Sequence, residues 1–374
     1  MPGPLNILHV FPTFKPGGSQ VRTIAIVNAM GTRAAHTFLA MDGDASASGR
    51  INANVRFQVI QPPPHRPALL QILALWHLIG QLQPNLVITY NWGAIESVAA
   101  SIARLCPVVH TEDGFGTDEA VKLHLRRVWA RRILLPRAYC TVVPSRTLLK
   151  ITRDKYRLPA GKVRFIVNGV DTDRFHPSRD PELRAELGCD EATIVFGYVG
   201  SLRAEKNIGL LLDAFARARI DNSRVILIGD GDKRRLLEEK ARDLAISDRV
   251  VFTGEVSQPA RYLAAVDVFT MSSVTEQMPL SLLEAMACGL PVICTDVGDS
   301  GELAGGIPPA VVPSGDLEAY THSIRLLAGD AGLRQRLGDA NRQRCLRDFT
   351  LDRMVREYEE VYFAAAGRSR SEPA

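Results

Sequence analysis

The feature that most constrains this chain is an alternation of short apolar runs with helical patterns, which occurs in two successive series. The apolar runs are nearly continuous, as in Leu86–Tyr90. Strands of this kind are typical of a parallel sheet that helices cover on both faces. Each series therefore predicts one doubly wound α/β domain.

The two series place the elements as follows. In the first, strands are expected at Leu5–Phe11, Phe38–Met41, Val55–Ile60, Leu86–Tyr90, Val108–Thr111, Ala138–Val143 and Val163–Val167, and helices at Ser19–Met30, Leu69–Gln81 and Ile95–Leu105. In the second, strands are expected at Ile194–Val199, Val225–Ile228, Val250–Thr253, Val266–Met271, Pro291–Thr295 and Ala310–Val312. Helices are expected there at Ile208–Ala218, Lys233–Leu244, Leu280–Met286, Leu317–Leu327, Leu333–Cys345 and Leu351–Ala364.

Between the series, Phe175–Asp190 is rich in Pro, Asp and Arg and is interpreted as a linker. A length of 374 residues fits two domains, at about 100–200 residues each. The predicted organisation is an N-terminal domain at 1–175, a C-terminal domain at 176–349, a final helix at 350–366 and a disordered tail at 367–374. Ligands of such sheets bind beyond the carboxyl ends of the strands, so the cleft between the domains is the expected site.

Composition excludes several classes of protein. No apolar run approaches the roughly 20 residues that span a bilayer, and no secretory signal opens the chain, so a cytoplasmic location is expected. The six cysteines are scattered without metal-ligand spacing, which favours buried free thiols. A net charge of +4 is too mild to indicate a nucleic-acid partner.

A candidate phosphate site follows the first strand of the second series. Gly200 lies in the loop between that strand and the next helix, and Arg203 and Lys206 follow it. Glycine allows a tight turn, a helix N-terminus favours an anion, and Arg and Lys both bind phosphate oxygens. These residues predict a diphosphate site, and the alternative is a strand-to-helix loop with two solvated cations.

Two glutamates mark a second candidate site. Glu276 precedes a predicted helix and Glu284 lies inside it among apolar residues, while Pro279 suits the first helical turn. A carboxylate in such a stretch requires a partner, and sugar hydroxyls are good ones. The alternatives are a surface charge for Glu284 and, for Glu276, an acid that the helix dipole favours.

The first series carries weaker signals. Gly17 and Gly18 precede a helix without a following cation, and they do not form the glycine pattern of a nicotinamide site. His110 ends a strand and is followed by Glu112 and Asp113, so it is either a polar contact at the ligand edge or a structural histidine.

Together these residues resemble the retaining glycosyltransferase family four, which has the GT-B architecture of two Rossmann-like domains facing across a cleft. The most specific part is Glu276–Pro291, which is similar to the family's E-x7-E signature and its Glu-Ala-Met-Ala helix. Residues 197–207 resemble the family's phosphate loop. Shorter matches extend the resemblance over nearly the whole chain, at Val143–Ser145, Asn168–Asp171, Gly229–Gly231 and Phe252–Gly254.

The resemblance implies roles for these positions. Arg203 and Lys206 would bind the donor diphosphate and, with His110 and Glu276, form the catalytic set. Glu276 would contact the donor sugar, His110 would lie near the transferred sugar, and Glu284 would hold the ribose. The other implied donor contacts are Gly17, Gly18, Gly200, Gly231, Thr253, Gly254, Pro279 and Leu280. The final helix would cross back onto the first domain.

Two positions depart from the family pattern. Gln277 stands where a glycine usually follows the first glutamate, which leaves the identity of the sugar open. Gln20 stands where the early Gly-Gly motif usually has a glutamate, so contacts at that loop are expected to differ.

The implied activity is transfer of a sugar from a nucleoside diphosphate, UDP or GDP, to a hydroxyl of a glycan or lipid-linked acceptor, with retention at the anomeric carbon. No metal or cofactor is expected, because the two cations would stabilise the leaving diphosphate and Asp171–Asp173 lies in the predicted hinge. The alternatives are a GT-B nucleotide-sugar epimerase and a non-catalytic nucleotide-sugar-binding partner.

The stretch Lys122–Arg137 is basic and amphipathic, with Trp129 among its apolar residues. Such a helix can dock on an anionic membrane surface, which would give the protein a peripheral location at the inner face of the membrane. The alternative is an ordinary domain helix with a solvated basic face.

Overall fold

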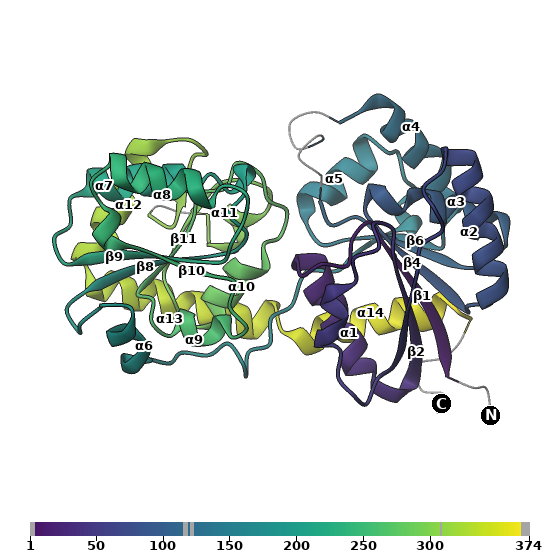
Figure 1. Cartoon of the computed structure of the whole chain (residues 1–374), viewed down its shortest axis with the longest axis horizontal. Coiled ribbons are helices and arrows are strands. Elements are labelled where there is room, and N and C mark those ends of the chain that lie inside the picture. Colours follow the sequence, from purple (N-terminus) through teal and green to yellow (C-terminus); the bar gives the residue numbers. More distant parts are fainter. Residues whose placement is uncertain (1–3, 115–118, 120–122, 307–308, 368–374) are drawn as a thin grey trace. The chain divides into compact units, whose positions relative to one another are not determined.

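The computed structural model describes residues 4–114, 119, 123–306 and 309–367. The chain divides into unit 1, Met1–Asn168 with Asp352–Ala374, and unit 2, Gly169–Leu351 (Figure 1). Residues 170–175, which the prediction assigned to the first domain, are bonded to unit 2, because Val170 N–H donates to the Phe349 carbonyl and Arg342 donates to the carbonyls of Thr172 and Phe175. Most of the predicted tail, 368–374, lies outside the described residues.

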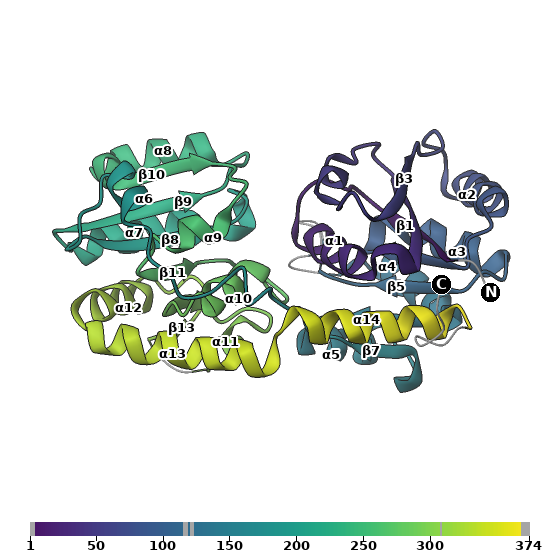
Figure 2. The ribbon, with the colours of Figure 1, turned by 90° about the horizontal axis from the view of Figure 1, so that it is seen from below.

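Unit 1 contains a parallel sheet in the order β3-β2-β1-β4-β5-β6-β7. Its strands are β1 Leu5–Phe11, β2 Ala34–Ala40, β3 Arg56–Ile60, β4 Leu86–Tyr90, β5 Val108–Thr111, β6 Cys140–Val143 and β7 Val163–Phe165. Its helices are α1 Gly18–Met30, α2 Ala68–Leu82, α3 Ile95–Ala103, α4 Leu125–Leu134, α5 Arg146–Asp154 and, from Asp352 onward, α14 Leu351–Ala365. Helix α14 runs along unit 1 (Figure 2) and is tied to α1, where Arg22 lies 5.3 Å from the ring of Tyr358.

Unit 2 contains a second parallel sheet, in the order β10-β9-β8-β11-β12-β13. Its strands are β8 Ile194–Val199, β9 Ser223–Ile228, β10 Val250–Gly254, β11 Val268–Met271, β12 Val292–Thr295 and β13 Val311–Val312. Its helices are α6 Pro181–Glu186, α7 Ile208–Ala218, α8 Arg234–Asp243, α9 Pro259–Leu263, α10 Leu280–Ala287, α11 Ser300–Leu303, α12 Leu317–Gly329 and α13 Ala331–Asp348. Figure 1 shows α7, α8 and α12 on one face of this sheet and α9, α10 and α13 on the other.

The predicted linker Phe175–Asp190 is partly a packed element rather than a free connection. Asp180 caps helix α6 by accepting from Leu183 N–H at 2.8 Å, and Pro181 occupies its first turn. The buried guanidinium of Arg184 donates to the carbonyls of Ala265 and Thr193. This segment therefore belongs to the core of unit 2.

The strand order places a topological switch point in each sheet. In unit 1 the order reverses between β1 and β4, and in unit 2 between β8 and β11. Loops that leave two such strands diverge to opposite faces of the sheet, which opens a crevice at their carboxyl ends. The loops after β8 and β11 carry Arg203, Lys206 and Glu276, while the loop after β1 ends at Gly17 and Gly18 begins α1.

Candidate functional site

The candidate site of unit 2 is built from loops that hydrogen bonds hold together at the switch point. Ser272, after β11, donates its hydroxyl to the carbonyls of Lys206 at 3.1 Å and Asn207 at 2.9 Å. Val274 N–H donates to the Glu205 carbonyl at 2.9 Å. The loop after β8 is thereby fixed against the loop after β11, which brings the predicted cations to the predicted acid.

Lys206 and Glu276 meet directly in this crevice. The distance from Lys206 Nζ to Glu276 Oε1 is 2.6 Å, and the Ser273 hydroxyl donates to the same oxygen at 2.7 Å. Both side chains remain partly exposed, at 25% and 12%. The pair is preorganised yet reachable, so an anionic ligand can replace Glu276 as the partner of the ammonium group.

Arg203 lies in the same loop as Lys206, three residues before it. Its side chain is exposed, and among the described residues its guanidinium has no hydrogen bond or ion pair. A guanidinium held near a lysine and a helix start is suited to bidentate binding of phosphate oxygens. The arrangement can therefore bind a diphosphate through two cations.

Gly200 is required where β8 ends. Its φ is +151°, and a Cβ there would lie 2.7 Å from the hydroxyl of Tyr198. Tyr198, which the sequence analysis did not single out, is buried, and its hydroxyl donates to the Ser201 carbonyl at 3.0 Å. Burial raises the pKa of this phenol, and the carboxylates of Glu276 and Glu205 raise it further.

Glu284 lies on α10 as a partly buried carboxylate. Among the described residues it has neither a hydrogen bond nor an ion pair, although the charge of Arg174 acts on it. Burial raises its pKa from 4.5 to about 7, and Arg174 opposes that shift. An acid kept unpaired in a desolvated position is costly, and such groups mark functional sites.

The remaining predicted donor contacts of unit 2 lie at the same carboxyl edge. Gly231 follows β9 and its Cβ would lie 2.5 Å from the Leu202 carbonyl oxygen, so only glycine fits. Thr253 and Gly254 end β10, where the Gly254 carbonyl accepts from Gly229 N–H at 3.0 Å. Pro279 is the residue before α10 rather than in its first turn, and Leu280 is the first helical residue.

A glycine missed in the sequence supports the glutamate loop. Gly298 has φ +57°, and a Cβ there would lie 2.1 Å from the carbonyl oxygen of Glu276. Asp299 N–H donates to the Gln277 carbonyl at 3.0 Å. The backbone of Glu276 and Gln277 is therefore held in place by the loop after β12.

The loop before α1 in unit 1 is organised by Gln20. Its Nε2 donates to the Thr13 carbonyl at 2.9 Å, and its Oε1 accepts from the Ser19 hydroxyl at 3.0 Å. A glutamate, which the family pattern has here, could not donate to that carbonyl. Gln20 therefore fixes the loop of Gly17 and Gly18, the residues that begin α1 with backbone N–H groups free of helical partners.

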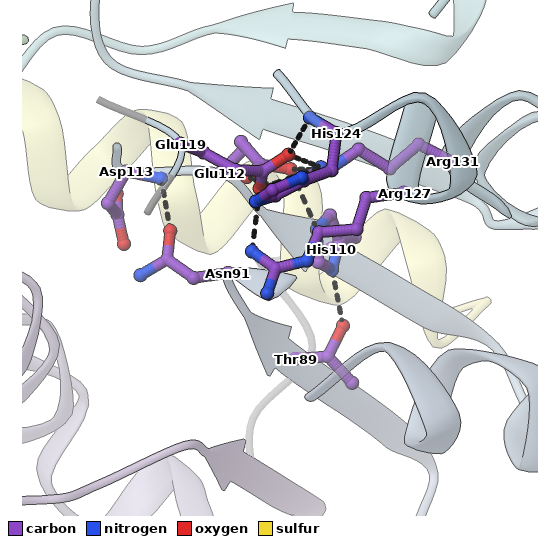
Figure 3. A network of polar contacts seen from close by, with 9 residues as sticks. All are labelled: Thr89, Asn91, His110, Glu112, Asp113, Glu119, His124, Arg127 and Arg131. Carbon is purple, nitrogen blue, oxygen red and sulfur yellow. Dashed lines mark hydrogen bonds and ion pairs between the residues drawn. The ribbon is translucent and has the colours of Figure 1, made fainter. Parts of the chain in front are cut away.

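His110 lies in a closed, fully buried network at the carboxyl edge of unit 1 (Figure 3). Its Nδ1 is 2.9 Å from the Thr89 hydroxyl, and its Nε2 is 3.4 Å from Glu112 Oε2. Arg131 binds Glu112 through two bonds of 3.0 and 2.9 Å. Both ring nitrogens are thus engaged by the protein, so a contact of His110 with a sugar would require an exchange of partner and stays a prediction.

Arg131 was predicted as part of a basic surface, and this is wrong. Its side chain is buried, with Glu112 on one side and Glu119 at 3.3 Å on the other. Burial raises the pKa of Glu112, but Arg131 and His110 outweigh burial and hold that pKa below its usual range. The network therefore orients His110 through Glu112, which follows it in the sequence, and through Arg131, which no motif connected with it.

A second buried cation, Arg22, connects α1 with the loop after β5 and with Asn168. Arg22 binds both carboxylate oxygens of Asp113 and donates to Asn168 Oδ1 at 3.3 Å. Asp113 N–H in turn donates to Asn91 Oδ1 at 2.7 Å. Loops after β4 and β5 are thereby tied to α1, one turn from Gly18.

The structure brings the predicted residues together in two groups, one in each unit. The unit 2 group contains Arg203, Lys206 and Glu276 at the switch point, with Gly200, Gly231, Thr253, Gly254, Pro279, Leu280 and Glu284 at the same sheet edge. The unit 1 group contains Gly17, Gly18 and His110. In the part of the chain that is described, no cluster of His, Cys, Asp or Glu could hold a metal ion.

Comparison with known proteins finds two family models. Residues 16–174 match the model described as Glycosyltransferase Family 4, and residues 193–330 match the model Glycosyl transferases group 1. One model falls in each series of strands and helices. The two matched ranges contain Gly17, Gly18 and His110, and Arg203, Lys206, Glu276 and Glu284, respectively.

Among curated proteins, the chain is 28% identical over 222 residues to N-acetyl-alpha-D-glucosaminyl L-malate synthase of Bacillus anthracis, covering 59% of this chain and 58% of that protein. It is 25% identical over 309 residues to UDP-Gal:alpha-D-GlcNAc-diphosphoundecaprenol alpha-1,3-galactosyltransferase of Escherichia coli, covering 78% of each. The match thus spans little more than half of the Bacillus protein and most of the Escherichia coli one.

Among solved structures, the chain is similar to Anabaena HepE in complex with UDP and glucose. The TM-score is 0.83 at 20% identity, with 95% of this chain and 98% of that chain covered. At this identity the likeness concerns the fold, which is GT-B with two α/β units of Rossmann type. With a family model on each unit, the chain belongs to glycosyltransferase family four.

Proposed function

We propose that the protein is a retaining glycosyltransferase that moves a sugar from UDP or GDP to a hydroxyl of a glycan or lipid-linked acceptor. The observation that carries the proposal is the group at the unit 2 switch point, where the loop that contains Arg203 brings Lys206 to Glu276. The named nucleotide donor of the Escherichia coli relative and the UDP bound to HepE support a nucleotide-sugar donor.

In the proposed reaction the diphosphate leaves the anomeric carbon with its electron pair. Lys206 and Arg203 stabilise the negative charge that develops on it, which is an electrostatic form of transition-state stabilisation. Glu276, released from Lys206 by the diphosphate, accepts hydrogen bonds from hydroxyl groups of the sugar, and Glu284 does the same for the ribose. No metal or cofactor is included, because the two cations supply the charge that the leaving group needs.

Retention follows if the acceptor attacks from the face that the diphosphate leaves, with a phosphate oxygen taking the acceptor proton. We expect a product with the anomeric configuration of the donor. The proton NMR coupling constant of the new anomeric proton measures this after transfer from the accepted donor. An inverted product would contradict the same-face reaction but would not contradict the proposed donor site.

Glu284 offers a test that separates binding from folding. We expect Glu284→Gln to bind UDP or GDP more weakly and yet to be more stable, by about 2 kcal/mol, because partial exposure reduces the cost of a shift from 4.5 to about 7. The pKa of Glu284 is higher in the folded protein than in the unfolded one. The destabilisation that its buried charge causes is therefore absent at a pH below the unfolded pKa and complete at a pH above the folded pKa. The stability gap between variant and wild type should therefore widen as the pH rises from about 5 to about 8.

Scanning calorimetry with and without each nucleoside diphosphate measures both effects, because a ligand that binds only the folded state raises Tm. The matched control is Glu318→Gln, an exposed glutamate on α12 that pairs with Arg217. Nucleotide binding should not change in this control, and stability should fall by less than about 1 kcal/mol, because the ion pair that it loses is exposed. A Glu284→Gln protein that keeps the full nucleotide-induced rise in Tm would contradict the ribose contact.

A further inference from the structure

Helix α4 of unit 1 exposes three large apolar side chains in one stripe. Leu125, Trp129 and Ile133 are 76%, 58% and 53% exposed and follow one another at a spacing of four residues. Residues at this spacing lie on the same face of a helix. The opposite face carries the buried Val128 and Arg131. The helix is therefore anchored in unit 1 while presenting an apolar stripe outward, which marks an interaction surface.

The surroundings of the stripe are strongly basic. Residues 125–157 contain ten Arg and Lys and one acidic residue, a net charge of +9, whereas the whole chain carries +4, so the remainder carries −5. The exposed cations of this segment are Arg126, Arg137, Arg146, Lys150, Arg153, Lys155 and Arg157. Charge in this protein is thus concentrated around the stripe.

Helices α4 and α5 hold these groups as one surface. Arg132, on α4, donates through Nε to the carbonyl of Lys155, just beyond α5, at 2.7 Å. Its guanidinium also lies 5.0 Å from the ring centre of Trp129. Arg131 stacks on Tyr156 from the inside at 5.1 Å. We define the α4–α5 face as Leu125, Trp129 and Ile133 with the exposed cations around them.

We propose that the α4–α5 face docks on an anionic lipid bilayer. Leu125, Trp129 and Ile133 enter the boundary between headgroups and acyl chains, while Arg126, Arg153 and Arg157 bind lipid phosphates. A nucleic acid would use the cations but has no need of the aliphatic Leu125 and Ile133. Among the described residues no helix is long and apolar enough to cross a membrane, so this docking is at the surface.

The docking is independent of the reaction, and it deepens the proposed function in one respect. A surface that holds unit 1 on a bilayer would favour an acceptor that is itself lipid-linked. Failure of docking would leave the glycosyltransferase proposal intact, since that proposal rests on unit 2, and loss of nucleotide binding would leave docking intact.

Sedimentation of the full-length protein with vesicles tests the proposal. We expect the protein to pellet with vesicles of equal parts phosphatidylcholine and phosphatidylglycerol, to stay in solution with phosphatidylcholine alone, and to be released by high salt. Arg126→Gln with Arg157→Gln should weaken partitioning roughly thirtyfold, because each arginine contributes a factor of about five near an anionic surface. Trp129→Ser with Ile133→Ser should weaken it as well.

Matched controls lie on other surfaces. Arg336→Gln with Arg356→Gln removes the same charge from α13 and α14, and Leu236→Ser removes an exposed leucine, 56% exposed, from α8. Both controls should partition as the wild type does. Trp129→Phe should keep binding but lose the blue shift of tryptophan fluorescence that insertion causes in the wild type.

Three outcomes would overturn the proposal. The wild type could remain in solution with the anionic vesicles, or the arginine variant could pellet as the wild type does. If only the arginine variant weakened and Trp129→Ser with Ile133→Ser had no effect, the face would be a polyanion site, as for RNA, and not a membrane surface.

Discussion

Replacing Lys206 with alanine is expected to lower kcat/KM about a thousandfold, which corresponds to about 4 kcal/mol of transition-state stabilisation. The ammonium group is held 2.6 Å from Glu276 in the free protein, so its position is set before the donor arrives. Without it, the developing charge of the diphosphate is met by Arg203 alone, and Glu276 becomes an unpaired anion beside the leaving group.

Kinetics with a sugar donor of the nucleoside diphosphate that scanning calorimetry identifies measure this loss. The fold should be little affected, because a pair with a partly exposed lysine contributes up to about 1 kcal/mol. The matched control is Lys240→Ala, which breaks a lysine–aspartate pair of similar length, 2.7 Å to Asp213, away from the crevice. A Lys206→Ala enzyme within tenfold of the wild type, with Lys240→Ala unchanged, would remove Lys206 from the phosphate site.

The fold was predictable because its strands are buried on both faces and therefore have abrupt apolar limits. The observed bounds of β1, β4, β5 and β8 are those expected, and α7 likewise. Helix α6 was missed because a helix of six residues, which begins at an Asp cap and a Pro, is too short to show a periodicity. Helix α5 was missed for a related reason, since most of its residues are polar and its start is marked only by the Ser145 cap.

The candidate site was predictable where one short segment carries the chemistry. Lys206 and Glu276 were identified from local motifs, and the switch point between β8 and β11 brings them together. Gly298 was not identified. It must be glycine because the carbonyl of Glu276 lies close to it in the folded protein, and the sequence around Gly298 does not reveal that contact. For the same reason the partner of Gln20, the Thr13 carbonyl, required the folded loop.

The burial of the charged residue Arg131 could not be predicted from the sequence either. In the sequence, Arg131 is one of several arginines of an amphipathic helix, and the periodicity of that helix does not tell which arginines face inward. The fold turns it toward Glu112 and Glu119 and leaves Arg126 outside. The helix therefore has a basic group that stabilises the core, Arg131, while Arg126 of the same helix is exposed at the surface.

Replacing Arg131 with methionine is expected to destabilise unit 1 by about 3–5 kcal/mol, because it leaves the buried carboxylates of Glu112 and Glu119 without their shared cation. The three tryptophans, Trp76, Trp92 and Trp129, all belong to unit 1, so urea denaturation followed by tryptophan fluorescence reports on this unit alone. The matched control is Arg126→Met, an exposed arginine of the same helix, which should change stability by less than about 0.5 kcal/mol.

The destabilisation of Arg131→Met is expected to depend on pH through the ionisation of Glu112. In the wild type the folded pKa of Glu112 is held below its ordinary value of 4.5, so its contribution to stability is present above that pH and lost as the pH falls below it. In Arg131→Met, the arginine no longer outweighs burial, so the pKa of Glu112 in the folded protein rises. Protonation of Glu112 at acidic pH then removes its buried charge and reduces the destabilisation of the variant. The gap between the two proteins should therefore be largest at neutral pH and narrow toward about pH 4.

A double variant separates lost pairing from lost packing. Arg131→Met with Glu112→Gln removes the carboxylate that has lost its arginine, whereas Glu119 keeps its ion pair with Arg127 at 3.2 Å. The double variant should recover part of the stability that Arg131→Met loses. If the single variant were as stable as Arg126→Met at neutral pH, the buried ion pairs would contribute nothing net. If the double variant recovered nothing, the loss would come from the packing of Arg131 against Trp92 and Tyr156, at 5.1 Å from each ring centre, rather than from charge.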